Sequence, residues 1–304
     1  MNVILKNSLF ILFCIFVFQS CKKDVVIPDN DAPYYGEIPT ILLENYVNRI
    51  YIDLIGREPL DAEMINDVQF LRDSEVTLES RDSLLRKIQF DTTFVEGDSS
   101  YRFAYYHRVY EMVKVRLLEG ASNSYISGDL NNWWNGYVRD SLDNDLLSAN
   151  KKLIEFHILN DVLASELDYY NGLIEINEMH RRMIYNSVYD KINMNTFNYI
   201  NAVFDNLLFR FPTAYEFDEV YKMIEDNTPQ IVLNSSGGNK ENFTHIVVNS
   251  REFYEGIIIW NYQTLLARDP NTQELDVLMN KFYIDHDLQW IQRQIMQTDE
   301  YAHF

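Results

Sequence analysis

The chain has little cysteine, glycine, proline or basic charge, and each shortage argues against a particular kind of structure or function. Its two cysteines are Cys14 and Cys21, and the first lies in an apolar leader, so a mature chain without that leader would have one cysteine and no intrachain disulfide. Lysine and arginine number 26 against 46 acidic residues, and a formal charge of -20 repels nucleic-acid phosphates. Ten glycines and seven prolines in 304 residues leave room for long helices.

Motifs for catalysis are also missing. The chain has no G-x-S-x-G, no P-loop, no G-x-G-x-x-G and no H-E-x-x-H, and its six histidines lack metal-ligand spacing. We therefore expect no cofactor, no metal and no enzymatic activity. Carboxylates are so numerous that a pair acting on a glycosidic bond remains an alternative.

Apolar material is abundant and has helical spacing. Hydrophobic residues make up 47% of the chain and aromatic residues 14%, which is enough for one large or two ordinary cores. Apolar residues recur every three or four positions, as in an amphipathic helix, and do not alternate strictly with polar residues as in a strand. The sequence therefore predicts an all-α fold.

The N-terminus has the pattern of an export signal. Residues 1–20 carry the cation Lys6 and then an apolar run that is shorter than the ~20 residues of a membrane span. The junction "FQSC" resembles a bacterial lipobox, which implies removal of residues 1–20 and acylation of Cys21. Two or more acyl chains would anchor the protein stably in a membrane. An ordinary signal peptide with a chance cysteine is the alternative.

The residues after Cys21 suggest a location. The start "CKKD" resembles that of outer-membrane lipoproteins from Bacteroidota, which implies the outer membrane and leaves its face, periplasmic or extracellular, open. Residues 21–40 contain three prolines and the acidic "DND", as expected for a flexible tether.

One phrase occurs three times, as "LIGREP" at 54–59, "LLFRFP" at 207–212 and "LLARDP" at 265–270. Upstream apolar residues share one helix face, the arginine falls in the last turn, and the proline stops the helix. A cap-x-x-Glu pattern then restarts it. We expect each arginine to be structural, as a helix cap or in an ion pair with a nearby acid such as the glutamate of its copy, and a ligand-binding role is the alternative. The repeated positions are Arg57, Pro59, Glu63, Arg210, Pro212, Glu216, Arg268, Pro270 and Glu274.

The copies differ in detail but close alike. Leu60 occupies the cap position of the first copy, so its second helix is expected to start differently. The closing stretches are "IQFDTTF", "VVNSREF" and "IMQTDEY". Their expected helix caps are Asp91, Ser250 and Thr298, and the expected buried anchors are Phe94, Phe253 and Tyr301.

These patterns predict three repeated helical units, at 41–95, 196–254 and 255–304, with a helical insert at 96–195 between the first two. Repeated units usually bury their apolar faces against their neighbours. The sequence leaves open whether they stack contiguously or pack around the insert.

The repeated pattern, aromatic-x-x-Leu-Leu-x-Arg-x-Pro-x-x-x-Glu, resembles the uncharacterised helical repeats of bacterial cell-surface and S-layer-associated proteins. It is more distantly similar to the helical domain of phycobilisome linkers, and "NRIYIDLIGREPLDAE" also resembles a domain of exported planctomycete proteins. The resemblance covers about half of the mature chain and none of the insert. It implies surface location and a scaffolding role, and it supplies no catalytic residues.

The insert contains the unusual stretch "NNWWNGY". Such a cluster more often closes a core under a long loop, and the alternative is that Trp133, Trp134 and Tyr137 form a sugar-stacking platform or a protein-binding hot spot. Three tripeptides resemble the O-glycosylation sequon of exported Bacteroidota proteins, with acceptors Ser83, Thr92 and Ser141.

Taken together, the sequence predicts a non-enzymatic envelope lipoprotein that binds another envelope protein or a glycan. The alternatives are a polysaccharide hydrolase and a glycan-capturing lipoprotein beside an outer-membrane transporter.

Overall fold

The computed structural model describes residues 38–95 and 97–304. The proposed signal peptide, Cys21 and nearly all of the proposed tether lie outside these residues.

The described part contains fifteen helices and one two-stranded antiparallel sheet, so the predicted all-α fold is confirmed. The elements are α2 (Thr40–Ile55), α3 (Asp61–Asp73), α4 (Leu78–Phe90), α5 (Tyr101–Leu117), α6 (Asn123–Leu142), α7 (Leu146–Tyr170), α8 (Ile176–Ile184), α9 (Ser187–Asn193), α10 (Thr196–Leu208), α11 (Ala214–Glu225), β1 (Gln230–Val232), β2 (Ser235–Gly237), α12 (Lys240–Val248), α13 (Arg251–Leu266), α14 (Thr272–Asp285), α15 (Leu288–Met296) and α16 (Asp299–Ala302).

Each copy of the repeated phrase separates two helices. The first lies between α2 and α3, the second between α10 and α11, and the third between α13 and α14. The residue before each arginine has a positive φ, at Gly56 (75°), Phe209 (55°) and Ala267 (54°). This left-handed residue ends the helix, and the following proline lies in the non-helical link.

The helices after the prolines begin with a glutamate that folds back on the start of its own helix. The side chains of Thr213 and Asn271 accept the N–H of Glu216 and Glu274, and these glutamates accept the backbone N–H of their caps in return. Leu60 offers no side-chain acceptor, yet its N–H still donates to Glu63 at 2.7 Å. The first copy therefore keeps half of the capping box.

The expected closing caps are correct in two copies and wrong in the first. Ser250 and Thr298 cap α13 and α16, and the rings three residues later, Phe253 and Tyr301, are buried. In the first copy Asp91 ends α4 instead of starting a helix, because its carboxylate accepts the N–H of Thr93.

The anchor expected at Phe94 is also wrong, since its side chain is 71% exposed. Phe94 instead forms an isolated antiparallel bridge with Ser100, and it is Ser100 that caps α5. The chain thus turns back on itself before the next helix begins.

The expected boundary at residues 254 and 255 falls inside α13, which continues without a break to Leu266. No proline follows the Ser250 cap until the third phrase, and Gly256 does not interrupt the helix. The second and third segments therefore share one helix, and α13 also packs against α10 and α12.

The third segment contacts the first as well. Helix α16 packs on α2 and α15 packs on α4. Tyr46 donates its hydroxyl hydrogen to the carbonyl of Met296 at 3.1 Å, and Tyr301 donates to Asp53 at 2.8 Å. The first and last helices of the described body are thus directly in contact.

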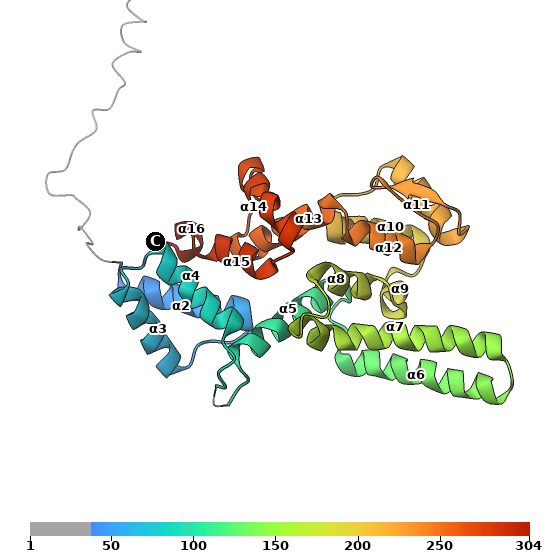
Figure 1. Cartoon of the computed structure of the whole chain (residues 1–304), viewed down its shortest axis with the longest axis horizontal. Helices are drawn as coiled ribbons and strands as arrows, with labels where there is room; N and C mark the ends of the chain where they lie inside the picture. Colours follow the sequence, from blue (N-terminus) through green and yellow to red (C-terminus); the bar gives the residue numbers. More distant parts are fainter. Residues whose placement is uncertain (1–37, 96) are drawn as a thin grey trace, which may run out of the picture. The chain divides into compact units, whose positions relative to one another are not determined.

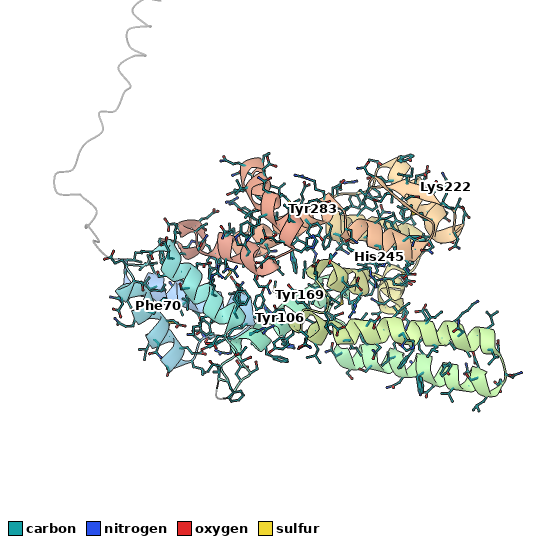
Figure 2. All side chains as sticks on the ribbon, in the orientation of Figure 1. Phe70, Tyr106, Tyr169, Lys222, His245 and Tyr283 are labelled. Atoms are coloured by element: carbon teal, nitrogen blue, oxygen red, sulfur yellow. The ribbon has the colours of Figure 1, made fainter. Side chains whose placement is uncertain are left out.

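The insert supplies a bridge and a hairpin. Helix α5 packs on α2 and α4 and also reaches α7 and α8, while α8 packs on α12. At the junction, the rings of Tyr106 in α5 and Tyr169 in α7 meet edge to face at 4.9 Å (Figure 2). Helices α6 and α7 run side by side as a long pair joined by a short turn (Figure 1).

Candidate functional site

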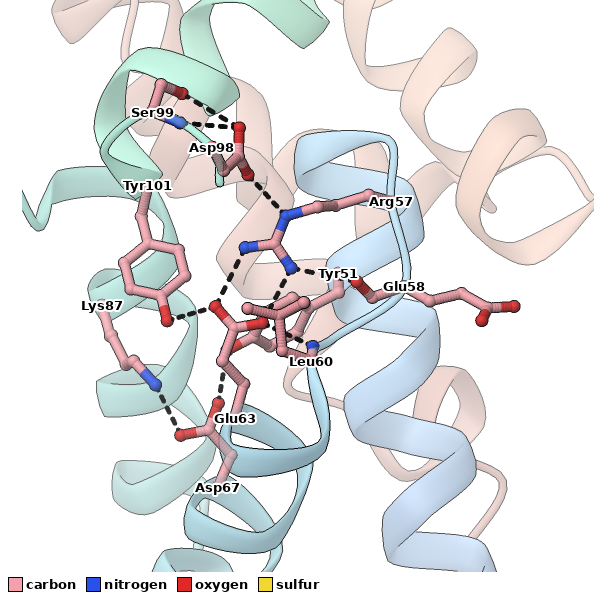
Figure 3. A network of polar contacts seen from close by, with 10 residues as sticks. All are labelled: Tyr51, Arg57, Glu58, Leu60, Glu63, Asp67, Lys87, Asp98, Ser99 and Tyr101. Atoms are coloured by element: carbon pink, nitrogen blue, oxygen red, sulfur yellow. Dashed lines mark hydrogen bonds and ion pairs between the residues drawn. The ribbon is translucent and has the colours of Figure 1, made fainter. Parts of the chain in front are cut away.

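The arginine of the first phrase is enclosed by acceptors (Figure 3). Arg57 donates from Nη1 and Nη2 to the two carboxylate oxygens of Glu63, at 2.7 and 2.9 Å, and from Nε to Asp98 at 2.6 Å. Glu63 also accepts the hydroxyl hydrogen of Tyr101 at 2.6 Å. The guanidinium therefore ties the end of α2 to the start of α3 and to the segment before α5.

The other two arginines have the same surroundings. Arg210 and Arg268 each bind the glutamate six residues later with two nitrogens, and each donates from Nε to a second acid at 2.7 and 2.6 Å. These second acids are Glu252 and Glu300, in the first turns of α13 and α16. In all three copies the arginine joins helix ends through two carboxylates, the arrangement expected of a structural ion pair.

Arg210 also changes the acidity of its partner Glu216. Donation from Arg210 lowers the pKa of the Glu216 carboxyl to about 2. Each guanidinium also lies 5.1 to 5.4 Å from the ring six residues before it. These rings belong to Tyr51, Phe204 and Tyr262.

In the insert, helix geometry separates the two adjacent tryptophans. Consecutive helical residues point about 100° apart, so Trp133 and Trp134 face different sides of α6. The indole N–H of Trp133 donates to the hydroxyl of Ser187 at 3.2 Å, at the start of α9. Trp134 is 43% exposed and lies 5.2 Å from Phe156 and 5.3 Å from Tyr137.

The Trp134 side of the hairpin is an exposed apolar stripe. Trp134, Val138 and Leu142 are four residues apart on α6, and all three are exposed. Leu142 is 82% exposed, the highest value for a large apolar side chain among the described residues, and Leu146 and Leu147 stand across the turn at 66% and 71%. We call Leu142, Leu146 and Leu147 the hairpin tip.

The Trp133 side is a polar groove of about 380 Å³. Gly136 lets the two helices approach closely, since a Cβ there would lie 2.9 Å from Cδ of Lys152. The lining residues are Asp129, Asn132, Trp133, Asn135, Gly136, Arg139, Lys152 and Lys191. We call this the Trp133 groove.

A buried carboxylate fixes the distal half of the hairpin. Asp140 accepts from Lys152 and Ser148 on α7 and from Arg139 beside it. Donation from Lys152 and Ser148 lowers the pKa of Asp140 to about 2. This cluster holds α6 and α7 in register where little apolar surface is buried between them.

The three candidate glycosylation residues lie apart from one another. Ser83 is exposed on α4 and its hydroxyl donates to the carbonyl of Glu79, Thr92 is exposed in the non-helical segment after α4, and Ser141 is half-buried near the end of α6. They share no surface.

Among the described residues no group of three or more His, Cys, Asp or Glu side chains is placed to hold a metal ion. Within the same residues, every helix is too short or too polar to cross a membrane. Comparison with protein-family models, curated proteins and solved structures gives no match to this chain.

Proposed function

We propose that this chain is a non-enzymatic outer-membrane lipoprotein, held by acyl chains on Cys21, whose helical body binds another envelope protein through the α6–α7 hairpin. The observation that carries the proposal is the hairpin tip. Three leucines that are 66 to 82% exposed gather at one turn of a chain with a formal charge of -20.

Exposed apolar side chains that cluster at one turn favour a binding surface. Fully burying one leucine contributes roughly 1.5–3 kcal/mol, so the three leucines of the tip would offset much of the entropic cost of association. Trp134 adds an aromatic anchor along the same stripe, of the type that dominates protein–protein interfaces.

Charge at the turn argues for a protein partner over lipid. Asp143 and Asp145 lie between the leucines of the tip, and both are exposed. Inserting two carboxylates into a bilayer interior would cost several kcal/mol each, roughly, after relaxation. A partner with an apolar pocket rimmed by lysine or arginine would satisfy both the leucines and the acids.

A tagged full-length chain, crosslinked in its own cells and purified in mild detergent, tests this proposal. We expect one partner to be captured, and at least tenfold less of it with a Leu142→Ser, Leu147→Ser variant. The matched control is Leu173→Ser, because Leu173 is 73% exposed but lies beyond the other end of α7. Helical circular dichroism should be equal in all three chains. Equal capture by the tip variant and the wild type would overturn the proposal.

The anchor has its own test. Cells fed an alkyne-labelled fatty acid should label the wild-type chain and leave a Cys21→Ala chain unlabelled. That variant should also leave the outer-membrane fraction. Retention of the label by the variant would rule out Cys21 as the lipid attachment point.

A further inference from the structure

We propose a second site on the opposite side of the hairpin: the Trp133 groove binds a carbohydrate that carries carboxylate groups. This inference is independent of the protein partner proposed for the hairpin tip, because the two surfaces use different faces of α6.

The groove has an aromatic wall that is held in place. Trp133 is half-buried, and its bond to Ser187 fixes the ring between α6 and α9. An indole held this way presents a flat apolar surface beside polar groups, which matches the C–H face of a pyranose ring. Trp134 and Tyr137 do not line this groove.

The groove also has free amides. Asn132 and Asn135 both line it, and neither side chain has a hydrogen-bond partner among the described residues. Each amide supplies two N–H donors and one carbonyl acceptor, the set that neighbouring sugar hydroxyls require. Asn131 is exposed on the same helix, as Asn132 and Asn135 are, but it lies outside the lining.

The charge of the groove selects the kind of sugar. Three cations, Arg139, Lys152 and Lys191, line it, while the acids that pair with them are only two, Asp129 and Asp140. One positive charge is left over in a chain whose formal charge is -20. A carboxylate on the ligand would form an ion pair with this excess positive charge, and the exposed Arg139 would donate the hydrogen bonds.

The shape agrees with a short glycan segment. The groove is open and its volume of about 380 Å³ falls in the range of small-ligand sites, roughly 300–1,000 Å³. Its floor is Gly136, and any side chain there would displace Lys152.

The test is a titration of the full chain in mild detergent against an array of acidic oligosaccharides, including oligogalacturonate and alginate fragments, and of neutral ones, including maltohexaose and cellohexaose. We expect binding to acidic glycans that an Asn132→Ala, Asn135→Ala variant reduces roughly tenfold or more. The controls Asn131→Ala and Trp134→Ala should bind as the wild type does.

The other possible results of the titration either support or overturn glycan binding in the Trp133 groove. Loss of the preference for acidic over neutral glycans in Arg139→Gln would support the assigned role of that cation. No binding to any glycan on the array, or binding that the groove variant leaves unchanged, would overturn the proposal. Because the Leu142→Ser, Leu147→Ser variant keeps the groove, it should still bind glycan, so failure at one site is distinguishable from failure at the other.

Discussion

At the scale of single residues, the helix stop depends on a left-handed residue directly before each arginine. The first copy has glycine there, at Gly56, while the others have Phe209 and Ala267. A side chain in this conformation costs roughly 1–2 kcal/mol, which glycine avoids. The arginine that follows then recovers free energy by binding two carboxylates, a geometry that lysine could not reproduce.

The substitution Ala267→Gly should therefore stabilise the protein by about 1 kcal/mol, since it removes strain in the folded state and this residue ends its helix. Urea denaturation followed by circular dichroism measures the change. Ala202→Gly, in the middle of α10, is the control and should destabilise by a similar amount. A loss of stability in Ala267→Gly would contradict the strain argument.

Stability should also depend on acidic pH through Glu216. Its folded pKa is about 2, below the ordinary value of 4.5, because Arg210 donates to the carboxylate. A depressed pKa contributes stability that is fully present above the unfolded value and is lost as pH falls through the folded one. The free energy of unfolding should thus fall from about pH 4.5 to pH 2. Denaturation at steps of pH should show a shallower fall for Glu216→Gln than for the wild type.

At the scale of elements, much of each helix–stop–helix segment could be predicted from local sequence. Arg210, Pro212 and Glu216 lie within seven residues of one another, so backbone geometry alone brings them together. The second acids, Glu252 and Glu300, are far along the chain, and only their place after a capping Ser or Thr hinted at them. Asp91 suggests a helix start by analogy with Ser250 and Thr298, but its carboxylate accepts the N–H of Thr93 in a non-helical segment.

The insert was harder to interpret from sequence. The sequence stretch suggests one platform that includes both Trp133 and Trp134, although residues one apart on a helix point in different directions. Only the contacts with Ser187 and Phe156 show which neighbours each ring has.

Helix α13 crosses α10 closely enough to exclude a methyl group at Gly256. A Cβ there would lie 2.1 Å from the carbonyl oxygen of Leu207. Gly256→Ala should therefore destabilise the protein by about 1–3 kcal/mol or more, although alanine favours helix. Thermal denaturation measures this, and Gly128→Ala is the matched control, because that helical glycine has nothing within 4 Å of its Cβ position. An unchanged Tm in Gly256→Ala would show that the two helices separate easily.

At the scale of the whole described body, the last residues hold the first helix. Tyr301 is fully buried, donates to Asp53 and contacts the ring of Tyr46. Arg81 in α4 donates to the carbonyl of Gln297 and to Asp299. The sequence could not predict this contact, since it joins residues more than 200 positions apart and depends on the whole path of the chain.

Tyr301→Ala should accordingly lower the free energy of unfolding by about 3–5 kcal/mol, an effect typical of a buried core residue. Hydrogen exchange should show faster exchange in α2 as well as in α16. Phe211→Ala serves as the control, because Phe211 is 68% exposed and should change neither. Unchanged protection of α2 in Tyr301→Ala would mean that the two ends fold independently.

The route from α2 to the hairpin determines which helices bear mechanical tension. Helix α2 packs on α5, and α5 packs on α7. A pull between Thr40 and Leu147 would load α2, α5 and α7 through their side-chain contacts, and residues 196–304 lie outside the stretch of chain between the two points. Those later helices would act as a brace, with α16 clamping α2 against being peeled away.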